Sequence, residues 1–73
     1  MSIMEPRRVT TEFQAKQVHR EPYHSELFRV GDQVALLHSE GAHDYFVRIP
    51  ATQGGRPEEY VTTDFVLKTE PMS

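Results

Sequence analysis

The sequence predicts an all-β fold, a small five-stranded antiparallel barrel with a long N-terminal loop or extension. Apolar and polar residues alternate at positions 33–38 and again at 44–49, as they do in strands with one buried face. Two shorter segments, 59–61 and 65–68, are rich in the aromatic and branched aliphatic residues that strands favour. Turn-forming residues separate all four segments. Short strands at such close spacing indicate a small barrel.

The N-terminal part of the predicted domain, residues 9–18, fits two structures. Apolar residues alternate with polar ones as in a strand, whereas the spacing of Val9, Phe13 and Gln17 fits one stripe of a helix. Three consecutive β-branched residues at 9–11 favour the strand. Helix remains the alternative for this segment.

Turn residues divide the remaining chain into strands. Residues 19–26 form a predicted polar loop that Pro22 interrupts. Gly31 and Asp32 predict a turn, because glycine reaches backbone conformations that strain other residues and an aspartate side chain can accept hydrogen bonds from nearby amides. The other predicted breaks are a hairpin loop, a longer glycine-containing loop and a tight turn, at residues 39–43, 51–57 and 62–64.

The strand pattern also predicts the core and the ends of the domain. On the same pattern Tyr45, Val47 and Ile49 share one face, and Phe46 points to the outer face, opposite Val47. Polar, proline-marked ends predict a flexible N-terminus at 1–8 and a flexible C-terminus at 69–73, with a single domain at 9–68. The predicted core consists of Phe28, Val34, Leu36, Val47, Ile49, Tyr60, Val61, Phe65 and Leu67.

Composition narrows the classes of function. The 73 residues include no cysteine, which excludes disulfides and thiolate chemistry. The net charge is −3, with +1 in residues 1–29 and −4 in residues 30–73. Because nucleic-acid affinity comes mainly from Lys and Arg contacts to phosphates, this balance disfavours nucleic acid and favours a protein partner with a basic or mixed surface. No apolar run is long enough for a membrane span and the first residues do not resemble a secretion signal, so we expect a cytoplasmic protein without a membrane partner.

The sequence repeats the spacing His-x-Glu-x-x-His. Imidazole and carboxylate groups can bind zinc, but this is not the spacing of the helical zinc proteases, and structural zinc sites usually include cysteine. We therefore predict that the chain has no cofactor and no tight metal site at His19, Glu21, His24, His38, Glu40 and His43.

Candidate catalytic groups are also scattered. Ser25 and Ser39 each directly follow a histidine, and neighbours on an extended chain point to opposite faces, so they cannot form a nucleophile–base pair. A domain of this size rarely encloses a large pocket. We expect a protein that is not an enzyme.

Three segments resemble the body of an SH3 domain. Residues 26–34 are similar to its diverging turn, 44–49 to its third strand and 59–66 to its closing segment. The tryptophan and the proline that grip polyproline peptides are absent, since Tyr45 and Phe46 begin the third strand and Thr62 stands in the closing turn. The same segments look like bacterial SH3- and Tudor-like modules, among them the RNA-polymerase-interacting domains of the CarD type. The resemblance implies the barrel and not a particular ligand.

Two hypotheses of function follow. The first is a protein-interaction module, in which the rim after the first two strands contacts a partner through Tyr23, His24, Phe46 and Arg48; the alternative for Tyr23 and Phe46 is packing in a thin core. The second is a module associated with nucleic acid or RNA polymerase, which would use the basic residues Arg7, Arg8, Lys16, Arg20 and Arg29.

Overall fold

The computed structural model describes residues 5–18, 24–49 and 58–72, which form an all-β structure with one short helix. In chain order these elements are β1 Glu5–Val9, β2 Phe13–Gln17, β3 Ser25–Phe28, β4 Gln33–Glu40, β5 His43–Ile49, β6 Glu59–Thr63, α1 Phe65–Lys68 and β7 Thr69–Pro71. Within these ranges no helix is long and apolar enough to cross a membrane.

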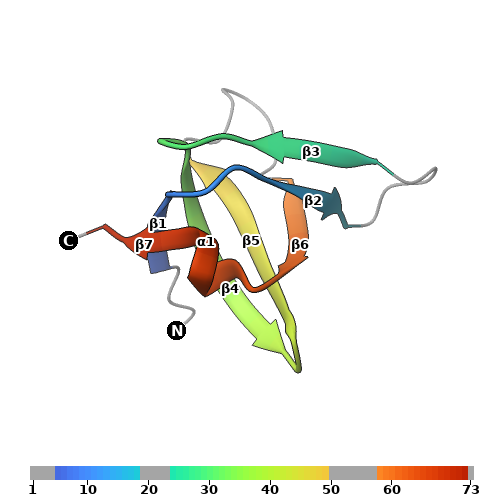
Figure 1. Cartoon of the computed structure of the whole chain (residues 1–73). Coiled ribbons are helices and arrows are strands. Elements are labelled where there is room, and N and C mark those ends of the chain that lie inside the picture. The colour runs from blue at the N-terminus through green and yellow to red at the C-terminus, as the bar shows by residue number, and fades with distance from the viewer. Residues whose placement is uncertain (1–4, 19–23, 50–57, 73) are drawn as a thin grey trace.

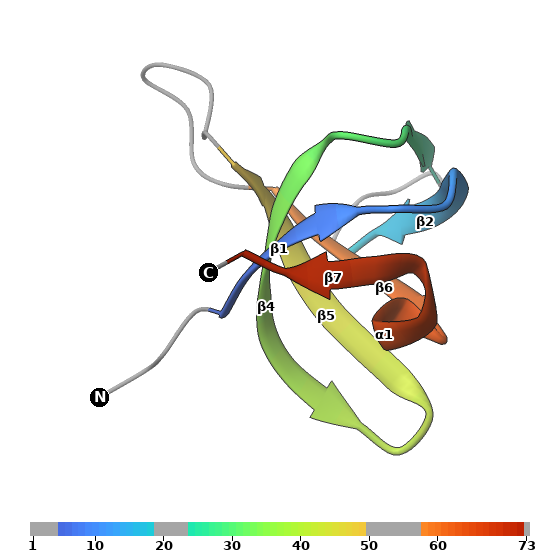
Figure 2. The same ribbon diagram turned by 60° about the vertical axis from the view of Figure 1, so that its left-hand side comes forward.

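The strands form a single antiparallel sheet in the order β3-β2-β6-β5-β4-β1-β7. The sheet curls into a half-barrel, with β3 and β7 as its two edge strands (Figures 1 and 2). Helix α1 lies between the end of β6 and the start of β7. All-β architecture is therefore confirmed, but the described residues contain seven strands where five were expected.

Three of the seven strands were not predicted, because one of the five expected strands, 65–68, is a helix. One of the three, β3, begins at Ser25 within the predicted loop 19–26, and the other two come from the predicted flexible ends. β1 lies between β4 and β7 in the sheet, so residues 5–8 and 69–71 are paired rather than frayed. The sequence pattern of β1 misled us because one of its two buried positions carries an arginine, Arg7, in place of an apolar residue. Phe13–Gln17 forms β2, so the strand alternative holds for this part of the ambiguous segment.

Aromatic rings fill the inside of the half-barrel. Their centroids lie 4.7–6.5 Å apart in stacked and edge-to-face pairs, arrangements that add about 0.5–1.5 kcal/mol per pair beyond the burial of their area. Val9, Ala15 and Val34 are buried beside the rings, and Leu36 packs against them from the edge. The five rings are Phe13, Phe28, Phe46, Tyr60 and Phe65.

Phe46 was predicted on the outer face and is fully buried in this core. Its backbone is paired with Leu36 on β4 and Tyr60 on β6, both of which contribute to the interior. Val47 is also buried, although it belongs to the opposite face, where it is paired with Ala35. The prediction failed because β5 is buried on both sides here, and strict alternation does not show which side is the core.

The segment 65–68 was predicted as the last strand and is a single helical turn. Asp64 adopts the left-handed conformation (φ 56°), which turns the chain out of β6 before α1 begins. Phe65 points into the core, but Leu67 is 77% exposed, so its predicted core position is wrong. Ile49 and Val61, also predicted in the core, are only partly buried.

The hairpin between β4 and β5 is tighter than the five-residue loop that was expected. β4 continues to Glu40 and β5 begins at His43, which leaves Gly41 and Ala42 as the connection. Gly41 has a positive φ of 60°, a conformation in which glycine is not strained. The two strands therefore extend to the very tip of the hairpin.

Candidate binding groove

Among the residues predicted to bind a partner, those that the structure describes do not form one exposed surface. Tyr23 lies outside the described residues. His24 is half-buried, with its Nε2 3.0 Å from a carboxylate oxygen of Glu26. Phe46 is fully buried and cannot contact a partner while the domain is folded. Of the two alternatives for Phe46, the structure supports packing in the core.

Arg48 is engaged within the fold. Its guanidinium carbon lies 4.3 Å from the centroid of the Phe28 ring. Nη1 donates a hydrogen bond to Asp32 Oδ2 at 3.1 Å, and Nη2 lies 3.5 Å from the carbonyl oxygen of Leu27. These contacts join β5 to β3 and to the turn before β4, a structural role that the sequence pattern did not indicate.

A hollow of about 530 Å³ opens instead on the outer face of the sheet. Three neighbouring strands form its floor and walls. We call it the groove, and its lining residues are Gln14 and Lys16 from β2, His43 and Tyr45 from β5, and Val61, Thr62 and Thr63 from β6.

Strand register places three of these residues in a row across the groove. Lys16 is paired with Val61, and Val61 is paired on its other side with Tyr45. Residues paired directly across antiparallel strands project from the same face. A cation, an aliphatic side chain and an aromatic ring therefore lie side by side in that order.

Contacts from β4 hold the aromatic wall of the groove. The ring of Tyr45 stacks on the ring of His38 with centroids 4.6 Å apart and planes within 10°. His38 Nε2 lies 3.2 Å from a carboxylate oxygen of Glu40. Stacking already restricts the rotation of the Tyr45 side chain. A ligand that contacts this ring would therefore cost the side chain little further entropy.

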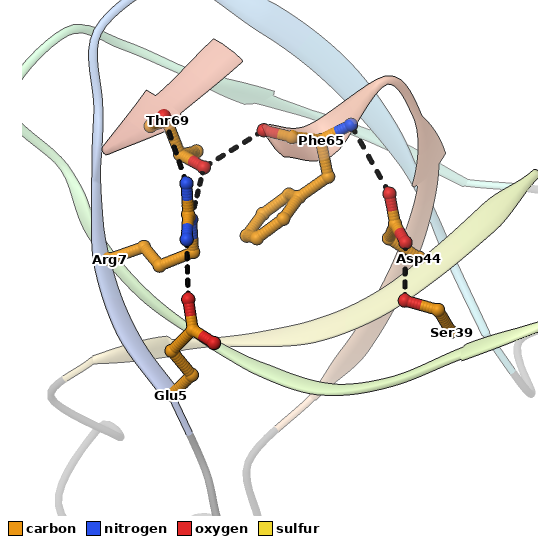
Figure 3. Close-up of polar contacts among 6 residues, drawn as sticks. All are labelled: Glu5, Arg7, Ser39, Asp44, Phe65 and Thr69. Atoms are coloured by element: carbon orange, nitrogen blue, oxygen red, sulfur yellow. Dashed lines mark hydrogen bonds and ion pairs between the residues drawn. The ribbon is translucent and has the colours of Figure 1, made fainter. Parts of the chain in front are cut away.

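On the inner side of the sheet, polar contacts hold α1, the element that follows β6 (Figure 3). Asp44 accepts hydrogen bonds from the Ser39 hydroxyl at 2.5 Å and from the Phe65 amide at 3.3 Å. The Thr69 hydroxyl donates to the carbonyl of Phe65 at 2.8 Å. The contacts of Phe65 with Asp44 and with Thr69 hold α1 against the sheet.

Arg7 completes this inner network. It forms an ion pair with Glu5, and its Nε donates to Thr69 Oγ1 at 2.7 Å (Figure 3). Its side chain is only 7% exposed. Because Arg7 and Thr69 are buried and their polar groups are satisfied within the network, we assign the network to stability and not to ligand binding.

Strand geometry explains the repeated His-x-Glu spacing in the residues that the structure describes. Residues two apart on a strand project from the same face, so His24 meets Glu26 and His38 meets Glu40. His43 is paired with Glu40 across the hairpin, while His19 and Glu21 lie outside the described residues. Among the residues that the structure places, no three histidine or acidic side chains gather around a point where a metal ion could sit.

Sequence reasoning missed the groove, although it placed Tyr45 on one face with Val47 and Ile49. That grouping is correct, since the three share the outer face, but we took this face for the core. The row across Lys16, Val61 and Tyr45 depends on the pairing of β2 with β6, which are far apart in the chain. No signal in the sequence specifies that pairing.

Comparison with known proteins gives no relative. No protein-family model, no curated protein and no solved structure matches this chain.

Proposed function

We propose that this chain is a small non-enzymatic protein-interaction module, an adaptor, regulator or accessory subunit of a larger complex. It binds a segment of a partner protein in the groove over β2, β6 and β5. The observation that carries the proposal is the row of Lys16, Val61 and Tyr45 across the floor of an open hollow.

The chemistry of the row suits a protein segment. A stacked tyrosine offers rigid apolar area at low entropic cost, and tyrosine is enriched among the residues that dominate interface energies. Val61 adds an aliphatic floor, and Gln14 and Thr63 add groups that can form hydrogen bonds with a peptide backbone. Apolar contact combined with a few directional polar groups is typical of binding sites.

A module associated with nucleic acid or RNA polymerase is the second candidate. One observation favours it, because a base could stack near Tyr45 while Lys16 meets a phosphate. The other basic residues give it little support. Arg7 is buried and Arg8 forms an ion pair with Glu70. With a net charge of −3 for the chain, a protein partner is the better match.

Selection from a random dodecapeptide library displayed on phage would test the proposed function. We expect peptides that bind the wild-type domain and the Val66→Ala variant but lose at least tenfold in affinity for Tyr45→Ala. Val66 is a matched control because it is 57% exposed and lies on α1, outside the groove. Amide chemical-shift changes of a selected peptide on the wild-type domain should centre on β2, β5 and β6. Shifts centred elsewhere, or binding that is indifferent to Tyr45→Ala, would refute the groove as the site.

A further inference from the structure

We infer that the edge strand β3 binds an extended segment of a partner protein, which adds to the sheet as a further antiparallel strand. β3 forms one margin of the half-barrel (Figure 1). Strand addition draws its affinity from main-chain hydrogen bonds, and alternate side chains supply the specificity. The inference concerns a second surface and does not depend on the function proposed for the groove.

The hydrogen bonds between β2 and β3 show which backbone groups of β3 face the edge. The Gln17 amide donates to the His24 carbonyl at 2.8 Å, just before β3 begins. Along antiparallel strands, pairs of residues that exchange hydrogen bonds alternate with pairs that do not. Followed along the register from this bond, Glu26 bonds β2, whereas Ser25 and Leu27 direct their amides and carbonyls away from it. In the part of the chain that the structure describes, no strand lies on that side of β3.

The contact of Arg48 with β3 agrees with this assignment. Its Nη2 lies 3.5 Å from the carbonyl oxygen of Leu27, which is one of the two carbonyls assigned to the edge. The contact is long for a hydrogen bond, so a closer amide of another chain can replace it. The β3 edge thus offers two amides and two carbonyls at alternate residues, and an extended segment presents its own backbone groups with the same spacing.

The opposite edge, β7, is poorly suited to such pairing. The Met72 amide donates to the Pro6 carbonyl at 3.2 Å, so the residues of β7 that face outward are Thr69 and Pro71. Pro71 has no amide hydrogen, and the Thr69 carbonyl accepts a hydrogen bond from Arg7 Nη2 at 3.2 Å. Proline is one of the features by which natural edge strands avoid pairing. β3 has no proline and keeps both of its outward amides, so it is the edge that can accept a strand.

A second copy of this chain does not suit the β3 edge. A twofold pairing of two β3 strands would place Ser25 opposite Leu27 and would bring the two Glu26 side chains directly opposite each other. Like charges in that position destabilise an antiparallel pair, and each chain has a net charge of −3. His24 lies 3.0 Å from Glu26 of its own strand, but in this pairing it would face Phe28 of the other copy and would not come between the two carboxylates. We therefore assign the edge to a different protein.

The register also specifies the segment that binds. Its residues opposite Ser25 and Leu27 exchange hydrogen bonds with β3, so neither of them can be proline. The residue between these two lies opposite Glu26, at a Cα distance of about 4.5 Å. A basic residue or a threonine suits this position, whereas an aspartate or a glutamate would repel Glu26.

Random octapeptides displayed on phage provide the first test, selected on the wild-type domain and counter-selected on Leu27→Pro. Proline at this position removes one outward amide and no hydrogen bond to β2. By fluorescence anisotropy, we expect a labelled peptide of the most enriched sequence to bind Leu27→Pro at least about tenfold more weakly than the wild type, because one peptide carbonyl loses its donor. Leu27→Val keeps the amide and should cost less than about threefold in affinity.

The variants also give the outcomes that would overturn the inference. Failure to enrich any peptide that distinguishes the wild type from Leu27→Pro would overturn it, while the groove is tested separately through Tyr45. Peptides that lose as much affinity for Tyr45→Ala as for Leu27→Pro would occupy the groove and would also overturn it. Should circular dichroism show that Leu27→Pro does not fold, Ser25→Pro removes the other outward amide and takes its place in the selection.

NMR spectroscopy of the wild-type domain with the same peptide provides the second test. Glu26 occupies a position of the new pair that exchanges no hydrogen bonds, where Cα atoms approach most closely. We therefore expect a nuclear Overhauser contact between its Hα and the Hα of one peptide residue, and slower exchange of the Ser25 and Leu27 amides in the complex. Peptide contacts centred on another strand would overturn the inference. A contact between the Glu26 Hα atoms of two copies in the free domain would overturn it in favour of a second copy.

Discussion

Arg7 and Arg48 make the same kinds of contact at opposite edges of the sheet. Arg7 lies 5.9 Å from the ring centroid of Phe65, pairs with a carboxylate and donates to the carbonyl of Thr69 on the edge strand β7. Arg48 lies 4.3 Å from the ring of Phe28, pairs with a carboxylate and reaches a carbonyl of the edge strand β3. Each arginine thus occupies an acceptor of an edge strand, where unpaired backbone groups would otherwise invite another chain.

The two arginines differ in burial and in the quality of their hydrogen bonds. The side chain of Arg7 is 7% exposed and that of Arg48 is 36% exposed. Arg7 also bonds the hydroxyl of Thr69 at 2.7 Å, whereas the contact of Arg48 with the β3 carbonyl is long, at 3.5 Å. The ion pairs do not make this difference, since Glu5 is more exposed than Asp32. A buried acceptor that loses its donor costs more than an exposed one, so we expect the β7 edge to depend on its arginine far more than the β3 edge does.

The largest effect should follow Arg7→Met. Methionine keeps much of the apolar contact with Phe65 but leaves the carbonyl and the hydroxyl of Thr69 without their donor. We expect a loss of about 2–4 kcal/mol in the free energy of unfolding, measured by urea denaturation. Arg7→Lys should recover only part of it, because an ammonium group lacks the planar fork of donors. A loss below about 1 kcal/mol for Arg7→Met would contradict the assigned role.

The second largest loss of stability is expected at alkaline pH, through Tyr60, whose pKa is influenced by the charge of Arg48. Burial, followed by the hydrogen bond to Glu58, raises the pKa of Tyr60 from 10.0 to about 12, and the charge of Arg48 partly opposes this rise. Because the folded pKa lies above the unfolded one, the folded state retains its proton longer. Stability is therefore fully present below pH 10 and is lost as the pH rises from about 10 to 12, by on the order of 2 kcal/mol.

Urea denaturation across this pH range, with Tyr60→Phe as the control, would measure the effect. The control should lose less stability between these pH values than the wild type does. Parallel curves for the two proteins would contradict the assignment to Tyr60.

A smaller effect is expected for Arg48→Met. Asp32 loses one partner but still accepts a hydrogen bond from the Arg29 amide at 2.9 Å, and methionine can still cover the Phe28 ring. We expect a loss of about 1 kcal/mol in the free energy of unfolding. Removal of the positive charge should also raise the pKa of Tyr60 further, which the ultraviolet absorbance of tyrosinate would report. A loss as large as that of Arg7→Met would erase the difference between the two edges.

The comparison also shows what the sequence could and could not predict. The paired strands β4, β5 and β6 and the core positions of Val34 and Phe65 follow from alternation and turn residues, which are local signals. β1 does not follow from these local signals. It has the polar residue Arg7 at a buried position, and the residue that binds it, Thr69 on β7, lies 62 residues away in the sequence.

The groove was beyond prediction for a related reason. Alternation separates the two faces of a strand but does not say which one meets the core, and in β5 both faces are buried at Phe46 and Val47. The outer face becomes a site only through the pairing of β2 with β6. Long-range pairing, and not residue type, decides which aromatic is core and which lines the groove.

The smallest effect should follow Leu67→Ser. Sequence alternation predicts a core leucine at this position, whose loss would cost several kcal/mol, but the side chain is 77% exposed on α1. The contacts that hold α1 include those of Phe65 with Asp44 and Thr69 and the hydrogen bonds from the Thr10 and Thr11 amides to the Lys68 carbonyl, none of which involves the Leu67 side chain. We therefore expect a change within about 0.5 kcal/mol in urea denaturation. Phe65→Ser, which removes a fully buried ring from the same helix, should unfold the domain or cost more than about 3 kcal/mol. If Leu67→Ser proved as costly as that control, α1 would be held by apolar packing, and the network around Arg7 would lose its assigned role.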